Sequence, residues 1–323
     1  MSEHSHRPPL GALLAVPLAV ALALTLFAWP SGRMRPRDVP VGVAGPPAAT
    51  QPIEGRLAEQ GGAFEVHSYA DGAAARRAIE DRRVYGAFVV KRGGAPQVLV
   101  ASAASPPVAQ SLREAAAAIR TPQGATRVVD VVPATSAAPA LPSSVLPLVL
   151  AGMLAAVIAT QLAAGALRES ALLLAAAALA GLAGIAIIQG WLGVVRGPWL
   201  VNAGVLGLTV LGVAATVAGL RAALGIPGAV TGALTMVLVG NPFSAAGTAP
   251  ELLPEPAGTI GQLLPPGAGA NLLRSTGYFD GAGAGGHLIV LLAWAGIGLT
   301  LLVVADARAR RAPVTSTLRP AAS

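Results

Sequence analysis

Apolar residues form six long stretches in this sequence, and polar residues gather between the first and the second. A helix needs about 20 apolar residues to cross roughly 30 Å of hydrocarbon. Stretches of this length predict six transmembrane helices, and none has an ionisable residue in its middle. They are Leu10–Trp29, Val145–Leu167, Ala171–Gly190, Trp199–Gly219, Ala222–Gly240 and His287–Ala305.

Residues 33–142 instead have the patterning of a water-soluble α/β domain. Strands are expected at Val39–Val43, Phe64–Tyr69, Ala87–Val90, Val98–Ala101 and, as a buried strand, Val128–Val132. Helices are expected at Ala48–Gln60 and Asp71–Val84, and a third opens at Ser105-Pro106. Asp71 is suited to cap the second helix. The resulting order β-α-β-α-β-β-α-β predicts a compact domain with a mixed sheet.

A second segment between apolar stretches, residues 241–286, is rich in Pro and Gly. Its short apolar pieces Thr259–Leu264 and Ala268–Leu273 indicate half-helices. Two interpretations stay open. The segment either dips into the membrane, where irregular backbone must be satisfied by protein or water, or lies on the surface as a loop.

Together these patterns predict an α-helical polytopic membrane protein with six transmembrane helices and an inserted extracytoplasmic α/β domain. The expected divisions are a tail and first helix (1–32), the α/β domain (33–142), a five-helix membrane domain (143–305) that contains the loop 241–286, and a basic tail (306–323).

Arginines in the short connections indicate the orientation. Six spans place both termini on one side, and cytoplasmic termini would put seven arginines inside: Arg7, Arg168, Arg221, Arg308, Arg310, Arg311 and Arg319. The short external segments hold only Arg196 and Arg274. The positive-inside rule therefore predicts cytoplasmic termini. A cleaved signal peptide is the alternative for the first span, although Phe27-Ala28-Trp29 lacks the small residues of a cleavage site.

Composition agrees with a lipid environment and removes several classes of function. Only 11% of the residues are charged, against roughly 25% in soluble domains. The absence of Cys removes disulfides and thiolate chemistry. The net charge of +7 rests on Arg, since Lys91 is the one lysine. No basic stripe interleaved with aromatic residues appears, so no nucleic-acid partner is expected.

Signatures of catalysis are also missing from the sequence. A P-loop needs a Gly-Lys pair, but Lys91 follows Val90. The sequence contains no G-x-S-x-G or H-E-x-x-H motif. We therefore expect no catalytic residue, no metal and no cofactor, and the chain is not expected to be an enzyme.

The candidate functional residues are polar side chains in the spans and residues of the external loop. Those in the spans are a possible substrate path or interhelical hydrogen bonds: Gln161, Asn202, Thr231 and Thr235. Those of a possible external gate are Asn241, Pro242, Glu251, Pro265, Pro266, Arg274 and Asp280. Small-xxx-small pairs such as Ala215/Gly219 and Gly228/Gly232 favour close helix packing, and Pro147 and Pro227 are expected kinks.

Several segments resemble those of a known family. They are Gly240-Asn241-Pro242-Phe243-Ser244, Pro250-Glu251-Leu252-Leu253-Pro254, Leu264–Gly269, Leu273-Arg274-Ser275, Tyr278–Gly281 and the stretch Asp71–Val90. With the order of one span, an external domain and five spans, the chain resembles ABC-2-type exporter permeases, specifically the YhgE/Pip membrane proteins. The resemblance implies a homodimer in a bacterial plasma membrane that contacts membrane lipids and exports a lipid, drug, peptide or polymer.

The resemblance further implies that a separate subunit hydrolyses the ATP. Such permeases are expected to offer that subunit a coupling helix between the second and third spans, and Leu167–Ser170 is too short for one. The alternative hypothesis is a non-transporting envelope scaffold or receptor, whose extracytoplasmic domain binds a partner.

Overall fold

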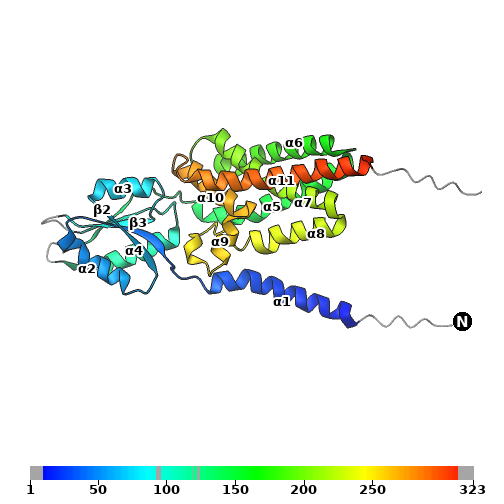
Figure 1. Cartoon of the computed structure of the whole chain (residues 1–323). Helices are drawn as coiled ribbons and strands as arrows, with labels where there is room; N and C mark the ends of the chain where they lie inside the picture. The colour runs from blue at the N-terminus through cyan, green and yellow to red at the C-terminus, as the bar shows by residue number, and fades with distance from the viewer. Residues whose placement is uncertain (1–9, 92–95, 119, 122–123, 312–323) are drawn as a thin grey trace, which may run out of the picture.

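The structure, a computed structural model, describes residues 10–91, 96–118, 120–121 and 124–311. Helix α1 (Leu10–Gly32) leads into an α/β domain, after which the chain forms a bundle of long helices (Figure 1). The first residues of α1 and the last residues of α11 (Ala284–Arg311) both lie opposite the α/β domain. We call that end of the bundle the far end, and the other the domain end.

The α/β domain is built on a five-stranded mixed sheet of order β2-β1-β3-β4-β7. Strand β1 is parallel to both β2 and β3, whereas β4 is antiparallel to β3 and parallel to β7. Two short strands form a separate ribbon. The strands are β1 (Val39–Ala44), β2 (Phe64–Tyr69), β3 (Gly86–Val89), β4 (Gln97–Val100), β5 (Arg120–Thr121), β6 (Gly124–Ala125) and β7 (Arg127–Asp130).

Helices cover both faces of this sheet. Helices α2 (Pro47–Ala58) and α4 (Pro106–Ala118) bury Leu57 and Leu112 against one face, and α3 (Gly72–Glu80) buries Ile79 against the other. Asp71 caps α3 as predicted, because its side chain accepts a hydrogen bond of 2.8 Å from the Ala74 amide. The predicted order of strands and helices is present, with the β5-β6 ribbon added.

Two predictions for this domain are wrong. The last strand ends at Asp130, and its first residues are exposed, because it lies at the edge of the sheet. The helix predicted over Asp71–Val84 ends at Glu80, and Arg82 adopts a left-handed backbone conformation with φ of 60°. This early end turns the chain toward the bundle and directs Arg82 there.

Five helices are long and apolar enough to cross a membrane. Besides α1 and α11 they are α5 (Leu141–Leu162), α6 (Ala166–Ile185), continued by a π-helical turn to Trp191, and α7 (Trp199–Leu224). Helix α7 is 83% buried over its most apolar window, against 22–33% for α5, α6 and α11. Helix α7 is therefore the centre of the bundle.

Glycines bring the backbones around α7 into close contact. A Cβ atom placed on Gly298 of α11 would lie 2.3 Å from the carbonyl carbon of Ala215, and one on Gly181 of α6 would lie 2.4 Å from the carbonyl oxygen of Ala203. These distances leave no room for a side chain. The close packing predicted from the small-residue pairs of α7 is confirmed.

The stretch predicted as a span over Ala222–Gly240 is shorter in the structure. Helix α7 continues to Leu224, and the left-handed Gly225, with φ of 71°, separates it from α8 (Ile226–Leu234) and the π-helical turn Thr235–Gly240. The run Ile226–Gly240 covers about 22 Å at 1.5 Å per residue, less than a bilayer core. Pro227 lies at the start of α8, so it does not kink a longer helix, whereas Pro147 lies inside α5.

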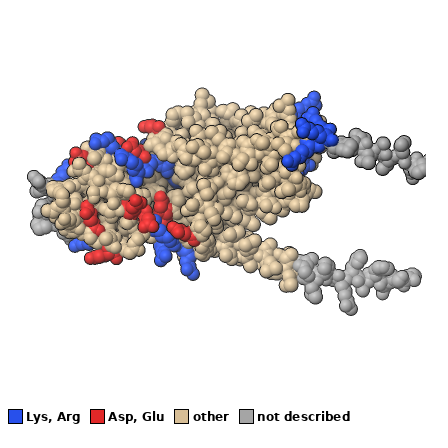
Figure 2. All heavy atoms as spheres, in the orientation of Figure 1, with Lys and Arg blue, Asp and Glu red and all other residues tan. Residues whose placement is uncertain are grey.

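Charged residues lie at the two ends of the molecule and leave a broad uncharged belt between them (Figure 2). One charged region is the α/β domain and its junction with the bundle. The other is a basic cluster at the far end, where α11 ends with Arg308, Arg310 and Arg311. The helices of this belt have the length and apolar composition expected of lipid-facing helices.

Candidate functional site at the junction of the α/β domain and the helix bundle

The chain between the π-helical turn and α11, residues 241–283, forms what we call the inserted segment. It contains α9 (Ala257–Gln262) and α10 (Pro265–Tyr278). It joins the core on both faces of the α/β sheet, through Leu252 on one face and Phe279 on the other. The inserted segment therefore connects the α/β domain to the bundle.

Helix α10 is buried within the bundle and runs beside the half of α7 nearest the domain. Its first residue, Pro265, lies 3.4 Å from the position of a Cβ atom on Gly212, at the middle of α7. Its other end lies near the start of α7, where Gly277 meets Val195. The neighbouring Pro266 meets Gly240, the last residue of the short helical run. Two helical segments that are each too short to cross a bilayer, Ile226–Gly240 and α10, thus meet at half the height of α7. We call them the two incomplete helices.

Arg82 of the α/β domain reaches across the junction to α10. Its Nη1 donates a hydrogen bond of 3.1 Å to the carbonyl oxygen of Asn271 and another to the Ser275 hydroxyl, and its Nη2 donates 3.2 Å to Asn271 Oδ1. The guanidinium also lies 5.3 Å from the ring centre of Phe279. Burial lowers the pKa of Arg82 below its usual range, and the nearby Tyr85 and Glu251 oppose that shift.

A second guanidinium, that of Arg274, lies beside the first. Arg274 is 3% exposed and donates 2.7 Å to Asn271 Oδ1 and 2.6 Å to the Ala246 carbonyl. Asn271 in turn donates 2.6 Å to Gln262 of α9. In the described part of the chain, neither Arg82 nor Arg274 lies within 4.0 Å of a carboxylate. Neutral amide and carbonyl oxygens therefore hold two adjacent positive charges.

Two further contacts join the α/β domain to the inserted segment. Arg37 donates 3.1 Å and 2.8 Å from Nη1 to the carbonyl oxygens of Leu252 and Leu253. The Tyr85 hydroxyl donates 2.9 Å to Glu251. Burial, reinforced by the charge and hydrogen bond of Glu251, raises the pKa of Tyr85 above its usual range, so the phenol stays a donor.

A cavity of about 560 Å³ opens between these groups, and we call it the junction cavity. Its polar lining includes Arg37, Asp38, Arg82, Glu251, Glu255, Gln262, Asn271 and His287. Leu263, which accepts a hydrogen bond of 2.7 Å from Trp294 of α11, adds an apolar edge and is 57% exposed. The lining of the cavity therefore combines polar and charged groups with an exposed apolar side chain.

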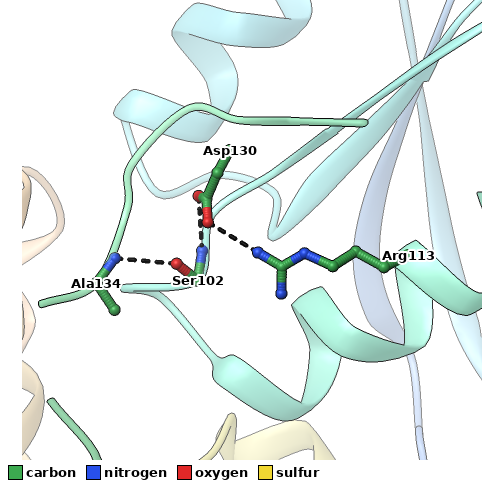
Figure 3. Close-up of polar contacts among 4 residues, drawn as sticks. All are labelled: Ser102, Arg113, Asp130 and Ala134. Carbon is green, nitrogen blue, oxygen red and sulfur yellow. Dashed lines mark hydrogen bonds and ion pairs between the residues drawn. The ribbon is translucent and has the colours of Figure 1, made fainter. Parts of the chain in front are cut away.

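The chain leading from the α/β domain into α5 is also held in place. The Asp130 carboxylate accepts 2.8 Å from Arg113 of α4 and 3.1 Å from the Ser102 amide, and the Ser102 hydroxyl accepts 2.9 Å from the Ala134 amide (Figure 3). One residue further, the Thr135 hydroxyl donates 2.9 Å to the Val194 carbonyl. These contacts fix the domain at a second point of attachment.

Of the four polar residues predicted in the spans, only Asn202 joins helices. It is fully buried at the domain end, donates 2.8 Å to Gln189 and accepts 2.7 Å from Thr276 of α10. Thr231 and Thr235 bond carbonyls of their own helical run, and Gln161 is exposed near the far end. The four residues are not brought together into a path.

The predicted gate residues fall into separate places. Glu251 lines the junction cavity, and Arg274 lies buried beside it. Pro265 and Pro266 start α10 at half the height of α7. Asn241 and Pro242 are half-buried just after the short helical run, while Asp280 is exposed and lines a different hollow, next to Asp81.

Sequence reasoning missed Arg82, Tyr85, Gln262, Asn271 and His287 as cavity residues. No regular spacing in the sequence connects these residues, because Arg82 and Tyr85 lie between α3 and β3 and the other three lie in α9, α10 and α11. The one available hint was the unbroken charge run Glu80-Asp81-Arg82-Arg83 at the end of an amphipathic helix. The described residues contain no group of three or more His, Asp or Glu side chains able to hold a metal ion.

Comparisons with protein-family models, with curated proteins and with solved structures each found no match to this chain. The conclusions on function therefore rest on the geometry described above.

Proposed function

We propose that this chain is the membrane subunit of an exporter for an amphipathic substrate, energised by ATP hydrolysis in a separate subunit. The observation that carries the proposal is the meeting of two incomplete helices, Ile226–Gly240 and α10, at half the height of α7. Interrupted helices at the bilayer midplane are a feature of transporters, because irregular backbone there needs protein or water to satisfy it.

In this proposal the chain passes through the membrane six times. The five long helices make five of these passes, and the sixth uses the short run Ile226–Gly240, which does not cover the full thickness by itself. The basic far end faces the cytoplasm with both termini, in agreement with the positive-inside rule. The α/β domain then lies outside a bacterial plasma membrane. Helix α1, only 6% buried in its apolar window, has surface free for lipid or for a second copy in a homodimer.

The proposed mechanism uses the mechanical link between the α/β domain and α10. Arg82, Arg37 and Tyr85 attach the domain to the inserted segment, so a movement of either would be transmitted to the place where α10 meets Gly240. That meeting point would open and close a route past α7. Arg274 and Asn271, between the two regions, would keep α10 in register during the movement.

A matched pair of glycine variants tests this function. A Cβ atom on Gly240 would lie 2.8 Å from Pro266 Cγ, whereas one on Gly204 meets nothing within 4 Å. The full chain, purified with its co-purifying subunits and reconstituted in vesicles, is assayed for ATP-dependent movement of a fluorescent amphipath. We expect Gly240→Ala to slow movement about tenfold and Gly204→Ala to leave it unchanged. Failure to recover any ATPase subunit in mild detergent would contradict the proposal.

A second candidate function is a cell-envelope scaffold or receptor, and one observation favours it. The connection between α5 and α6 is only Ala163–Gly165, and that between α7 and α8 is Gly225, so the described far end offers helix ends but no coupling helix. Deleting residues 40–135 separates the two functions. Loss of partner binding with unchanged flux would favour the scaffold.

A further inference from the structure

The junction cavity is lined by charges of both signs that make no ion pair with one another. Arg37 and Arg82 reach it from the α/β domain, and Glu251 and Glu255 reach it from the inserted segment. Within the described residues, none of the four lies within 4.0 Å of an oppositely charged side chain. The described hydrogen bonds of Arg82 use Nη1 and Nη2 only, and the exposed Glu255 side chain makes none, so both groups keep hydrogen-bonding capacity for a ligand.

Each kind of charge selects a ligand group. A guanidinium presents planar N–H donors that match the oxygens of a phosphate. A carboxylate accepts hydrogen bonds from an ammonium group. Asp38, Glu251 and Glu255 would repel a ligand that carries only negative charge, and Arg37 and Arg82 would repel one that carries only positive charge. The lining therefore fits a zwitterion.

The position of the cavity matches the depth of a lipid headgroup. It lies where the uncharged belt ends, beside His287 at the start of α11. A neighbouring hollow shares Arg37, Asp38 and Glu255 with it and extends to Trp29 at the end of α1. Tryptophan favours the interface between headgroups and hydrocarbon. The exposed Leu263 lines the cavity next to Trp294 of α11, and supplies apolar surface for acyl chains.

We propose that the junction cavity binds the headgroup of a zwitterionic phospholipid, with its phosphate toward Arg82 and its ammonium toward Glu255. This inference rests on the proposed function and deepens it, because it names the substrate class. The phosphate would complete the hydrogen bonding around Arg82, and the acyl chains would leave along Leu263.

Native mass spectrometry of the purified full chain measures the binding directly. The probes are phosphatidylethanolamine and phosphatidylglycerol with identical acyl chains, offered in equal amounts. We expect the wild type to retain phosphatidylethanolamine about five times more strongly than phosphatidylglycerol. The preference is modest because the ammonium group and Glu255 form a single exposed ion pair, and such pairs are weak. Equal retention of the two lipids, or preference for phosphatidylglycerol, would overturn the proposal.

Glu255→Gln supplies a variant that keeps the fold, because the side chain of Glu255 is exposed and makes no hydrogen bond among those described. It should remove the preference for phosphatidylethanolamine, whereas Glu59→Gln, at an exposed glutamate of the α/β domain away from the cavity, should keep it. An unchanged ratio in Glu255→Gln would overturn the assignment of the ammonium group.

Arg82→Gln should weaken retention of both lipids about tenfold, since a charged hydrogen-bond donor to phosphate is lost. Its control is Arg83→Gln, one residue away, whose exposed side chain pairs with Asp81 at 3.0 Å and should leave retention unchanged. If Arg82→Gln fails to purify as a folded protein, Glu255→Gln still decides the question. Unchanged retention by a folded Arg82→Gln would overturn the assignment of the phosphate.

Two further measurements distinguish a lipid headgroup from free phosphate, and lipid binding from lipid transport. Displacement of the lipid by millimolar inorganic phosphate would overturn the proposal in favour of a free-anion site, whereas resistance to it supports a lipid headgroup. The same preparations are assayed for ATP-dependent lipid movement. Selective binding without movement supports the site while contradicting the exporter, and movement without selective binding overturns the site alone.

Discussion

Helices α1 and α7 have nearly the same apolar character and lie in opposite surroundings. The mean hydropathy of their most apolar windows is 1.9 and 2.0, yet 6% of the first window and 83% of the second is buried. Hydropathy reports that both avoid water, and it does not distinguish lipid from protein as the neighbour. Internal glycines do: α7 carries Gly207, Gly212 and Gly219 in close contacts, whereas α1 has glycine only near its ends.

The largest effect should come from truncating leucines in the two helices. Leu206 of α7 is 1% exposed, and Leu22 of α1 is 53% exposed. We expect Leu206→Ala to lower the free energy of unfolding by about 3 kcal/mol because it leaves a cavity, and Leu22→Ala by less than about 0.5 kcal/mol. Unfolding by sodium dodecyl sulfate in mixed micelles measures both. Equal losses would show that α1 is packed like α7.

A smaller effect should follow from adding one methyl group beside α7. Gly298→Ala places its Cβ against the Ala215 backbone, while Cβ at Gly296, two residues away in the same helix, meets nothing within 4 Å. The expected loss is about 2 kcal/mol for Gly298→Ala and close to none for Gly296→Ala. The same unfolding titration applies. A tolerated Gly298→Ala would contradict the close approach of α11 to α7.

Polar side chains extend the comparison. Asn202 of α7 bonds Gln189 and Thr276 on other elements, whereas Thr25 of α1 bonds the Ala21 carbonyl of its own helix. We expect Asn202→Ala to cost about 1 kcal/mol, the range of hydrogen bonds between membrane helices, and Thr25→Ala to have no measurable effect. A cost for Thr25→Ala equal to that of Asn202→Ala would show that α1 has an interhelical partner.

The smallest effect concerns the pH dependence of stability. Helix α1 contains no titratable side chain, whereas the attachment of the α/β domain beside α7 includes Tyr85. The pKa of Tyr85 is raised in the folded protein, so the unfolded chain releases the phenolic proton first and stability falls as pH rises above about 10. The expected loss from this residue is about 0.8 kcal/mol between pH 9 and 10.5. Tyr85→Phe should remove it, and an unchanged pH slope in that variant would contradict the burial of the phenol.

Much of the architecture could be predicted from the sequence, because apolar length and turn residues are local signals. The strand and helix order of the α/β domain and five long apolar helices were expected at nearly their observed positions. The structure differs from the prediction in the extent of the stretch Ala222–Gly240, because Gly225 and Pro227 lie near its start and divide it. The residues on both sides of this division are apolar, so hydropathy alone predicts one continuous span.

The candidate site was harder to predict because its parts come from distant segments. Glu251 and Arg274 were singled out in the external loop, and the structure places Glu251 in the junction cavity and Arg274 buried beside it. Arg82, which shares Asn271 with Arg274, was expected in a helix, but that helix ends two residues earlier. Asn202 was singled out for its polarity in an apolar helix, and it does join helices. Thr231 and Thr235 gave the same signal and bond only their own helix.

The central claim is that α10 reaches half the height of α7, and a disulfide tests it most directly. The chain contains no Cys, so two can be introduced without background. A Cβ atom on Gly212 would lie 3.4 Å from Pro265 Cβ, close to the ~3.8 Å of a disulfide. We expect the pair Gly212→Cys with Pro265→Cys to cross-link on mild oxidation in membranes, and Gly204→Cys with Pro265→Cys to stay reduced. Cross-linking of the second pair and not the first would place α10 at the membrane surface and contradict the account.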